Sequence, residues 1–526
     1  MPALPRSSPR GSRTKMSALG EEFGPEAPPL SQFIQKTLRE YTNGSPILNE
    51  ILQNADDARA ERVCIMFDKR THHSVDLPDG FTDLTKTQGP ALIAFNSGIF
   101  EDRDFESIQH IGQSGKERDP RKTGKFGLGF LSVYHWTDTP QIVSHETYAL
   151  CDPLHTVVHT GTRPGKKWSF AAGTIIRLPL RKVSSDLSGQ VPGLAMVEQA
   201  CKDMAQEADT LLLNLKHVQA LVVTVWDEGA TAPRVLTRTK LVSTPAAIDV
   251  RTSLPQLFAD YVAAQASVTE DFDSFSGVIP SLPELLEVDP LPPLDSLKLM
   301  AYSIQVESWR PDSKRPTECH HCTVDDWLVS GALGGAYAGR LSRYAASQYR
   351  GPHLIPFASI AAKEASLVRT FAGPLSTERT TAPPQSTTTA PAASLPATGG
   401  GHVFCFLPLP GPTGLPVHVN AHFVLSSNRC SIMPVSAGIT GESRVQAFFR
   451  ENMLCICEGA GDKFKKKGVE KGSMCHRAAG YGRGEVGADR GDKMQVSTVE
   501  LEASEEGADE SKPRSPSWRL SFGNFR

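Results

Sequence analysis

Residues 47–58 read ILNEILQNADDA, and the interpretation of the whole chain starts from them. Their apolar positions recur at i, i+3/i+4 and i+7/i+8, which predicts an amphipathic helix with one buried stripe. Glu50, Asn54 and Asp57 stand at i, i+4 and i+7 and therefore share one face of that helix. A carboxylate one turn from a carboxamide suits nucleotide hydrolysis, because the acid can activate water and the amide oxygen can ligate Mg²⁺. A solvated polar face of a surface helix gives the same pattern.

The composition is that of an ordinary globular protein. At about 150 residues per domain, the 526 residues suggest two to four units. Hydrophobic residues make up 39% of the chain and charged residues 21%, which is enough apolar content for a sizeable core. The net charge of −3 argues against general attraction to nucleic acid or to an anionic membrane. No apolar run reaches the roughly 18 residues of a membrane span, and the scattered cysteines fit a reducing, cytoplasmic setting.

Two apolar runs after the first helix predict buried strands. They cover residues 62–67 (RVCIMF) and 90–95 (PALIAF), and both are apolar on the two faces of a strand. The second run ends in the turn sequence Asn96-Ser97-Gly98. A short helix is expected over residues 105–111. The polar turn therefore lies at the end of a predicted strand, where side chains of a site are often placed.

A basic, glycine-punctuated segment runs from Gly112 to Gly129 and closes in GKFGLGF at residues 124–130. Glycines let the backbone approach an anion, and the amides at the start of the following helix add a natural phosphate site. The basic residues of this segment are Lys116, Arg121, Lys122 and Lys125. Flexible surface loops share this composition. Its position beside the Glu50 helix and the Asn96 turn favours phosphate binding.

The rest of the chain predicts alternating strands and helices around two low-complexity regions. Short strands are expected at 141–144, 149–151, 157–159, 174–178 and 221–226, and a long helix at 196–215. Residues 227–330 read as further strands and linkers. The predicted divisions are a disordered leader (1–23), a first domain (24–190), a middle α/β region (191–371), a Thr/Pro/Ala-rich linker (372–401), C-terminal strands (402–455) and a disordered tail (456–526).

Cys319-His320-His321-Cys322 is the one local cluster of metal-ligand residue types. A structural zinc site needs a second, similarly spaced group, and Cys455 with Cys457 is a poor match for one. A polar loop before a strand is the default interpretation, with zinc as the alternative.

The motifs, taken in order, resemble the four sequence boxes of the GHKL superfamily. These motifs are Glu50-x-x-x-Asn54-x-x-Asp57, Asn96-x-Gly98, Gly124-x-x-Gly127-x-Gly129 and Gly173-Thr174. Longer stretches, among them ADTLLLNLKHV and FCFLPLP, are similar to the sacsin repeat-region family, and the similarity runs from about residue 24 to residue 451. The resemblance implies an α+β chain. By this resemblance, a Bergerat α/β sandwich would be followed by a second α/β segment, with the linker and tail disordered.

The same resemblance implies a role for each site residue. Asn54 would bind Mg²⁺, Glu50 would activate water and Asp57 would support the pocket, while Gly124, Gly127 and Gly129 would cover the phosphates of ATP. The remaining residues placed at the nucleotide are Asn96, Gly98, Lys116, Lys125, Phe126 and Thr174. The second box departs from the superfamily, with Asn96 in place of an aspartate and Phe100 in place of a glycine. Asparagine can still pair with adenine, without the charge-assisted contribution.

Two functions follow as hypotheses. The first is an ATP-binding, slowly hydrolysing module with a chaperone-like role, with client proteins or chaperones as partners and a dimer on ATP binding, as in GHKL relatives. The following domain often completes such sites with a basic residue, for which Arg429 is the candidate and a plain surface arginine the alternative. The second is a non-catalytic scaffold that retains the fold. The retained Glu50 favours the first hypothesis, whereas Asn96 and Phe100 favour the second.

Overall fold

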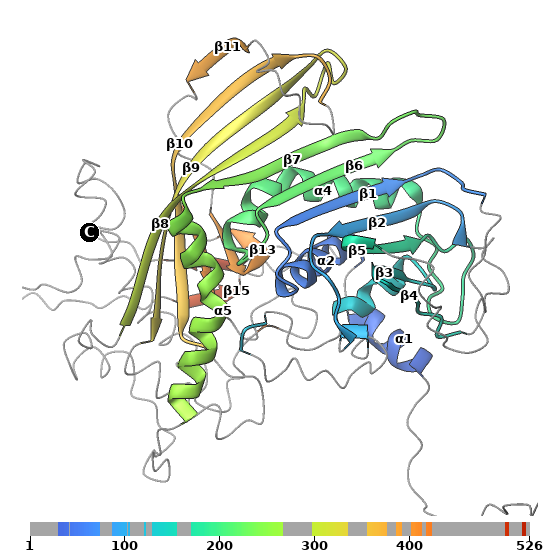
Figure 1. Cartoon of the computed structure of the whole chain (residues 1–526), viewed down its shortest axis with the longest axis horizontal. Coiled ribbons are helices and arrows are strands. Elements are labelled where there is room, and N and C mark those ends of the chain that lie inside the picture. Colours follow the sequence, from blue (N-terminus) through green and yellow to red (C-terminus); the bar gives the residue numbers. More distant parts are fainter. Residues whose placement is uncertain are drawn as a thin grey trace, which may run out of the picture.

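The computed structural model has one large mixed sheet with helices packed against it (Figure 1). It describes residues 30–40, 43–73, 87–102, 104–105, 120–122, 129–154, 170–266, 297–334, 355–375, 386–391, 401–412, 417–422, 425, 500–503 and 518–521. The helices are α1 (Leu30–Glu40), α2 (Ser45–Asp57), the 3-10 helix η3 (Gly129–His135), α4 (Leu194–Leu211), the 3-10 helix η4 (Leu212–Asn214) and α5 (Pro245–Ala266).

The strands of the first half of the chain are β1 (Arg62–Asp68), β2 (Ala91–Asn96), β3 (Gln141–His145), β4 (Thr147–Leu150), β5 (Phe170–Pro179), β6 (Ala220–Trp226) and β7 (Arg234–Ser243). Those of the second half are β8 (Leu297–Pro311), β9 (Cys319–Gly334), β10 (Phe357–Ala372), β11 (Ser386–Pro391), β12 (His402–Cys405), β13 (Leu407–Pro412) and β14 (His418–Ala421). Two further strands, β15 (Glu500–Ala503) and β16 (Trp518–Ser521), pair with each other.

The large sheet joins the two halves of the chain. Its strand order is β13-β12-β14-β10-β9-β8-β7-β6-β1-β2-β5-β3-β4, with β11 added to β10. Among the described pairs, β1–β6 and β12–β14 are parallel and the others are antiparallel. Such a mixed, mainly antiparallel sheet with helices packed on it agrees with the predicted α+β class.

The predicted helix at residues 47–58 is confirmed as α2, which begins two residues earlier with Pro46 in its first turn. Proline is tolerated there because the first amides of a helix have no partner within the helix. The apolar stripe of α2 is buried in one core with α1, η3, α4 and the neighbouring strands. Its buried residues include Ile47, Leu48, Ile51, Leu52 and Ala55, each 3% exposed or less. The opposite face of α2 is thereby left to carry the polar residues.

Strand pairing brings the predicted turn and the predicted fourth box together. β2 lies between β1 and β5, and Asn96 pairs with Val63 on one side and with Thr174 on the other. Residues 62–67 and 90–95 were predicted as strands, and β1 and β2 confirm both to within a residue. Their apolar side chains suit central positions, where both faces of a strand are covered.

Helix α5 is a correction to the sequence analysis, which expects only strands and linkers over residues 227–330. Its apolar residues are distributed around the helix and Pro255 lies within it, so neither periodicity nor propensity predicts a helix. Tertiary packing stabilises it instead, because Leu254 and Phe258 are buried in a second core cluster with Phe357 and Phe406. Figure 1 shows α5 lying along β8.

Three segments contain strands where the sequence predicts none. Ser386–Pro391 lies within the predicted linker and pairs with β10 as β11. Its threonines are β-branched residues, which favour strands, and an edge strand of a sheet tolerates proline. β15 and β16 lie in the predicted disordered tail. Cys319–Cys322 begins β9 and is not a loop before a strand. The strand expected at residues 157–159 and the leader lie outside the described residues, as does all but the first residue of the helix expected at 105–111.

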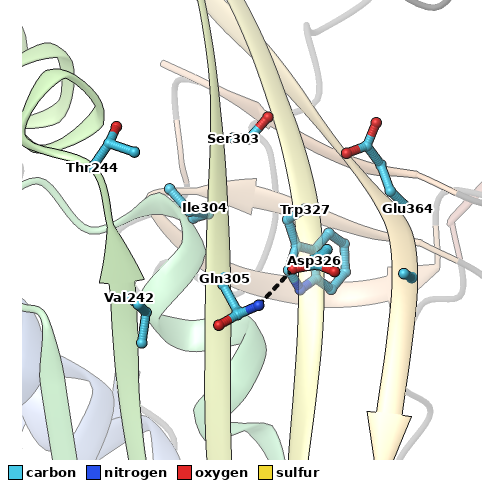
Figure 2. Close-up of a pocket in the computed structure, with 9 residues that line it drawn as sticks. Val242, Thr244, Ser303, Ile304, Gln305, Asp326, Trp327 and Glu364 are labelled. Carbon is cyan, nitrogen blue, oxygen red and sulfur yellow. Dashed lines mark hydrogen bonds between the residues drawn. The ribbon is translucent and has the colours of Figure 1, made fainter. Parts of the chain in front are cut away.

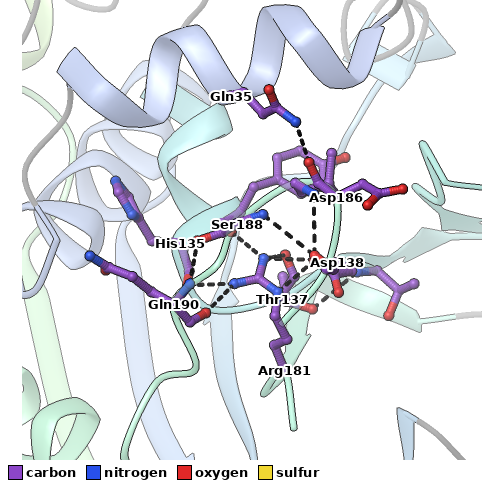
Figure 3. Close-up of polar contacts among 12 residues, drawn as sticks. Gln35, His135, Thr137, Asp138, Arg181, Asp186, Ser188 and Gln190 are labelled. Atoms are coloured by element: carbon purple, nitrogen blue, oxygen red, sulfur yellow. Dashed lines mark hydrogen bonds and ion pairs between the residues drawn. The ribbon is translucent and has the colours of Figure 1, made fainter. Parts of the chain in front are cut away.

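Arg181 fixes η3 and the connection that precedes α4 (Figure 3). Its guanidinium donates to the carbonyl oxygens of Tyr134, His135 and Gln190, at 2.6, 3.1 and 2.9 Å, and pairs with Asp138 at 2.7 Å. The Arg181 side chain is only 1% exposed. A buried guanidinium with this set of acceptors holds the end of η3 in place.

We expect Arg181→Met to lower the free energy of unfolding by about 3 kcal/mol, because it leaves buried carbonyls and Asp138 without their donor. Arg310→Met is the matched control, since Arg310 also donates to backbone carbonyls, of Ala205 and Gln206, from a side chain that is 29% exposed. Its expected cost is about 1 kcal/mol. Urea unfolding of both variants measures the difference, and equal costs would contradict the role given to Arg181.

Candidate functional site

Glu50 and Gly129 form the centre of the candidate site. Glu50 lies on α2 and is 9% exposed, and Gly129 begins η3. A Cβ atom at position 129 would lie 1.8 Å from Oε2 of Glu50 and 2.7 Å from its Cδ. The carboxylate therefore occupies the space that any side chain at position 129 would take. The structure thus brings the predicted water-activating acid against the last glycine of the predicted phosphate segment.

Asn54 lies one turn after Glu50 on the same helix and is half-buried. Its backbone carbonyl accepts from the amide of Ala58 at 3.0 Å. Across the described part of the chain, the Asn54 carboxamide itself makes no hydrogen bond. The amide oxygen of an asparagine is a suitable ligand for a hard cation such as Mg²⁺.

Asp57 is engaged by a lysine that the sequence analysis did not single out. Nζ of Lys216 donates to Oδ1 of Asp57 at 3.0 Å and to the backbone carbonyl of Arg121 at 3.2 Å. The two side chains are 3% and 2% exposed, so this ion pair is buried. Asp57 thus supports the α2 end of the site through Lys216.

The neighbouring carboxylate, Asp56, secures the loop that carries Lys216. It accepts the backbone amides of Lys216, His217 and Val218 at 3.1, 2.7 and 3.0 Å and is 1% exposed. Burial is the largest influence on His217 and lowers the pKa of its imidazole, against the opposing effect of Asp56. A carboxylate with three amide donors is a structural anchor.

Asn96, Gly98 and Thr174 form one hydrogen-bonded turn. Oδ1 of Asn96 accepts the amide of Gly98 at 3.0 Å, and Oγ1 of Thr174 donates to the carbonyl of Gly98 at 2.8 Å. Ser144, which the sequence analysis missed, lies 2.7 Å from the Thr174 hydroxyl and accepts the amide of Phe100 at 2.9 Å. Asn96 is 5% exposed and Thr174 is fully buried. These side chains therefore shape the turn, and Asn96 keeps its NH₂ group and one carbonyl lone pair for other partners.

The remaining predicted site residues lie outside the described residues. These are Lys116, Gly124, Lys125, Phe126 and Gly127, together with Arg429. Apart from Arg429, twelve site residues are predicted. The structure describes seven of them, which lie on α2, at the start of η3, and on or next to the paired strands β2 and β5.

A hollow of about 370 Å³ lies elsewhere, on the sheet surface over β7 to β10 (Figure 2). Gln305 and Asp326 form its floor, with Nε2 of Gln305 donating to Oδ1 of Asp326 at 2.8 Å. Glu364 and Trp327 also line it. None of the predicted site residues is among those that line it. The candidate nucleotide site is therefore defined by side-chain geometry around α2.

Both histidines of the Cys319–Cys322 segment have other partners in the structure. His321 bridges Asp312 and Thr370 at 2.7 and 3.0 Å, and Nδ1 of His320 lies 2.9 Å from the carbonyl of Gly373. Burial raises the pKa of the Cys322 thiol to about 12. Within the described residues, no group of three or more His, Cys, Asp or Glu side chains is placed to hold a metal.

Comparisons with known proteins support the resemblance to sacsin. Residues 27–172 match the family model described as Sacsin domain. The chain is 27% identical to human sacsin over 449 residues, which is 78% of this chain and 9% of that protein. A solved structure titled the N-terminal domain of a DNA repair protein covers 57% of this chain and 70% of its own, with 11% identity and a TM-score of 0.26.

The chain is a mixed α/β protein whose residues 27–172 are similar to the sacsin domain. It is a sacsin-like protein that spans about 9% of the length of human sacsin. None of the described helices is both long enough and apolar enough to cross a membrane.

Proposed function

We propose that this chain is an ATP-binding, slowly hydrolysing module of the GHKL type, with a Bergerat α/β sandwich around α2. The observation that carries this proposal is the contact between the Glu50 carboxylate and Gly129, with the Asn54 carboxamide one turn away. An acid and an amide oxygen in this order on one helix supply a water-activating group and a cation ligand.

Each residue has one task in this proposal. Asn54 would hold Mg²⁺, which would supply positive charge to neutralise the phosphates. Glu50 would orient the attacking water and accept its proton. Gly129 leaves space for the Glu50 side chain, and the turn at Gly98, held by Asn96 and Thr174, would lie at the adenine end. The sheet beneath holds these elements in fixed positions relative to one another.

The proposed biological role is chaperone-like and belongs to protein quality control, by similarity to human sacsin. Client proteins or other chaperones are the proposed partners, and a dimer that forms when ATP binds is proposed by likeness to GHKL proteins. A cytoplasmic location fits these partners.

One observation favours the second candidate, a non-catalytic scaffold. Asn96 stands in place of the aspartate of GHKL proteins and uses its Oδ1 on the Gly98 amide. A neutral side chain that already accepts one hydrogen bond binds adenine less tightly than a carboxylate does. The retained Glu50 and its contact with Gly129 favour the ATPase.

The test is thermal unfolding of the full chain with and without ATP and Mg²⁺. At a nucleotide concentration about 100 times Kd, binding to the folded state stabilises by about 2.7 kcal/mol, so the melting temperature rises by a few degrees. Asn54→Ala is expected to lose this rise. Gln199→Ala, which removes an exposed carboxamide on α4, is the control and keeps it. A parent protein with no rise at millimolar MgATP supports the scaffold.

A further inference from the structure

Residues 212–218, between α4 and β6, connect parts of the molecule that are far apart in sequence. The side of this loop toward α2 is held by the Asp56 carboxylate, as described above. From the other side, the guanidinium of Arg251 on α5 donates to the carbonyl oxygens of Leu215 and Val218, at 2.5 and 3.3 Å. Arg251 is 2% exposed. The loop is therefore fixed between the helix of the proposed site and the helix that packs on β8.

Lys216 extends this connection to the C-terminal strands. Its Nζ lies 5.3 Å from the centroid of the Phe406 ring, in addition to its bonds to Asp57 and Arg121. Phe406 lies between β12 and β13 and is 2% exposed, and its amide donates to Oδ1 of Asn420 on β14 at 2.9 Å. One buried cation thus contacts the α2 end of the proposed site, the backbone at residue 121 and the strands at residues 402–421.

The Phe406 ring also belongs to a rigid aromatic group. It lies 6.2 Å from Phe258 of α5 and is stacked at 6.3 Å on Phe357 of β10. A desolvated cation is attracted to the face of an aromatic ring, and a buried charge strongly resists separation from its partner.

We infer that Lys216 is a positioning residue that couples occupancy of the proposed nucleotide site to strands β12 and β14. This inference rests on the proposed function. A bound, negatively charged nucleotide beside α2 changes the electrostatic field at the Asp57–Lys216 pair. The ammonium group, which contacts both Asp57 and the Phe406 ring, carries the change to the C-terminal strands.

The test is hydrogen exchange of the full chain, measured by mass spectrometry with and without about 5 mM MgATP. The parent is expected to show at least twofold slower exchange both in α2 and in β12 and β14. In Lys216→Met, the slowing in β12 and β14 disappears. Lys216→Arg restores it, because an arginine keeps both the pairing with Asp57 and the contact with the ring. Lys240→Met, which removes a half-exposed lysine paired with Glu307 on the same sheet, behaves as the parent.

A second variant keeps the test decisive if Lys216→Met does not fold. Phe406→Leu leaves the Asp57–Lys216 pair in place and removes the ring, so it is expected to lose the slowing in β12 and β14 alone. Slowing in α2 of the parent without slowing in the C-terminal strands would overturn the inference and leave the proposed function standing. No slowing anywhere in the parent would overturn the proposed function, and the inference with it.

Discussion

Glu50→Gln is expected to reduce ATP turnover by at least about 100-fold while MgATP binding stays within about threefold of the parent. Glutamine has nearly the shape of glutamate but cannot accept the proton of the attacking water, and a general base of this kind contributes about 10²- to 10⁴-fold. Phosphate release by the full chain measures turnover, and calorimetry measures binding. A variant that turns over as fast as the parent would remove Glu50 from the mechanism.

Gly129→Ala tests the same acid through space alone. The added methyl carbon would lie 1.8 Å from Oε2 of Glu50, so the carboxylate has to move away. Because the obstructed group is the end of a flexible side chain, the fold is expected to tolerate the change while turnover falls about as far as in Glu50→Gln. Gly193→Ala is the control, since a Cβ at position 193 meets no atom within 4 Å. Unchanged turnover in Gly129→Ala would show that the position of Glu50 is irrelevant to catalysis.

Gly173→Ala is expected to cost the largest share of stability, about 4 kcal/mol or more. A Cβ at this position would lie 2.1 Å from the backbone carbonyl oxygen of Asn96, and the φ angle of Gly173 is +150°. Both strands are fixed here, because β2 and β5 pair at Asn96 and Thr174. Neither backbone can shift without breaking that pairing, so the change disrupts the turn at the proposed adenine end.

Gly229→Ala is the matched control for conformational strain. Gly229 has a φ angle of +76°, but an added Cβ meets no atom within 4 Å, so only the backbone preference opposes the change, at about 1 kcal/mol. Urea unfolding followed by circular dichroism measures both variants. If Gly173→Ala costs no more than Gly229→Ala, the close approach of β5 to Asn96 is not a constraint on the fold.

Local patterns in the sequence predict the elements that surround the site. The 3.6-residue period of α2 and the apolar runs of β1, β2 and β6 are strong signals, because each element buries a continuous apolar face. Glu50, Asn54 and Asp57 share a face of α2 for the same geometric reason. Helix α5 could not be predicted in this way, because its apolar residues do not lie along one face of the helix. Packing against Phe357 and Phe406 stabilises it instead.

The supporting residues could not be predicted, because their partners lie far away in the chain. Lys216 reaches Asp57 across 159 residues, and Arg181 holds the carbonyl of Tyr134 across 47. Ser144 joins Phe100 to Thr174 with no motif around it. Hydrogen bonds between such distant positions depend on the strand order of the sheet, which the local pattern of apolar residues does not specify.

The most direct measurement is calorimetric titration of the full chain with ATP in the presence and absence of Mg²⁺, beside Asn54→Ala. We expect saturable heat with one nucleotide bound per chain, weaker binding without Mg²⁺, and binding at least about tenfold weaker in Asn54→Ala, equivalent to about 1.4 kcal/mol. Saturable binding that is indifferent both to Mg²⁺ and to Asn54 would contradict the placement of the site on α2. No heat at millimolar nucleotide would contradict the proposal that this sacsin-like chain binds ATP.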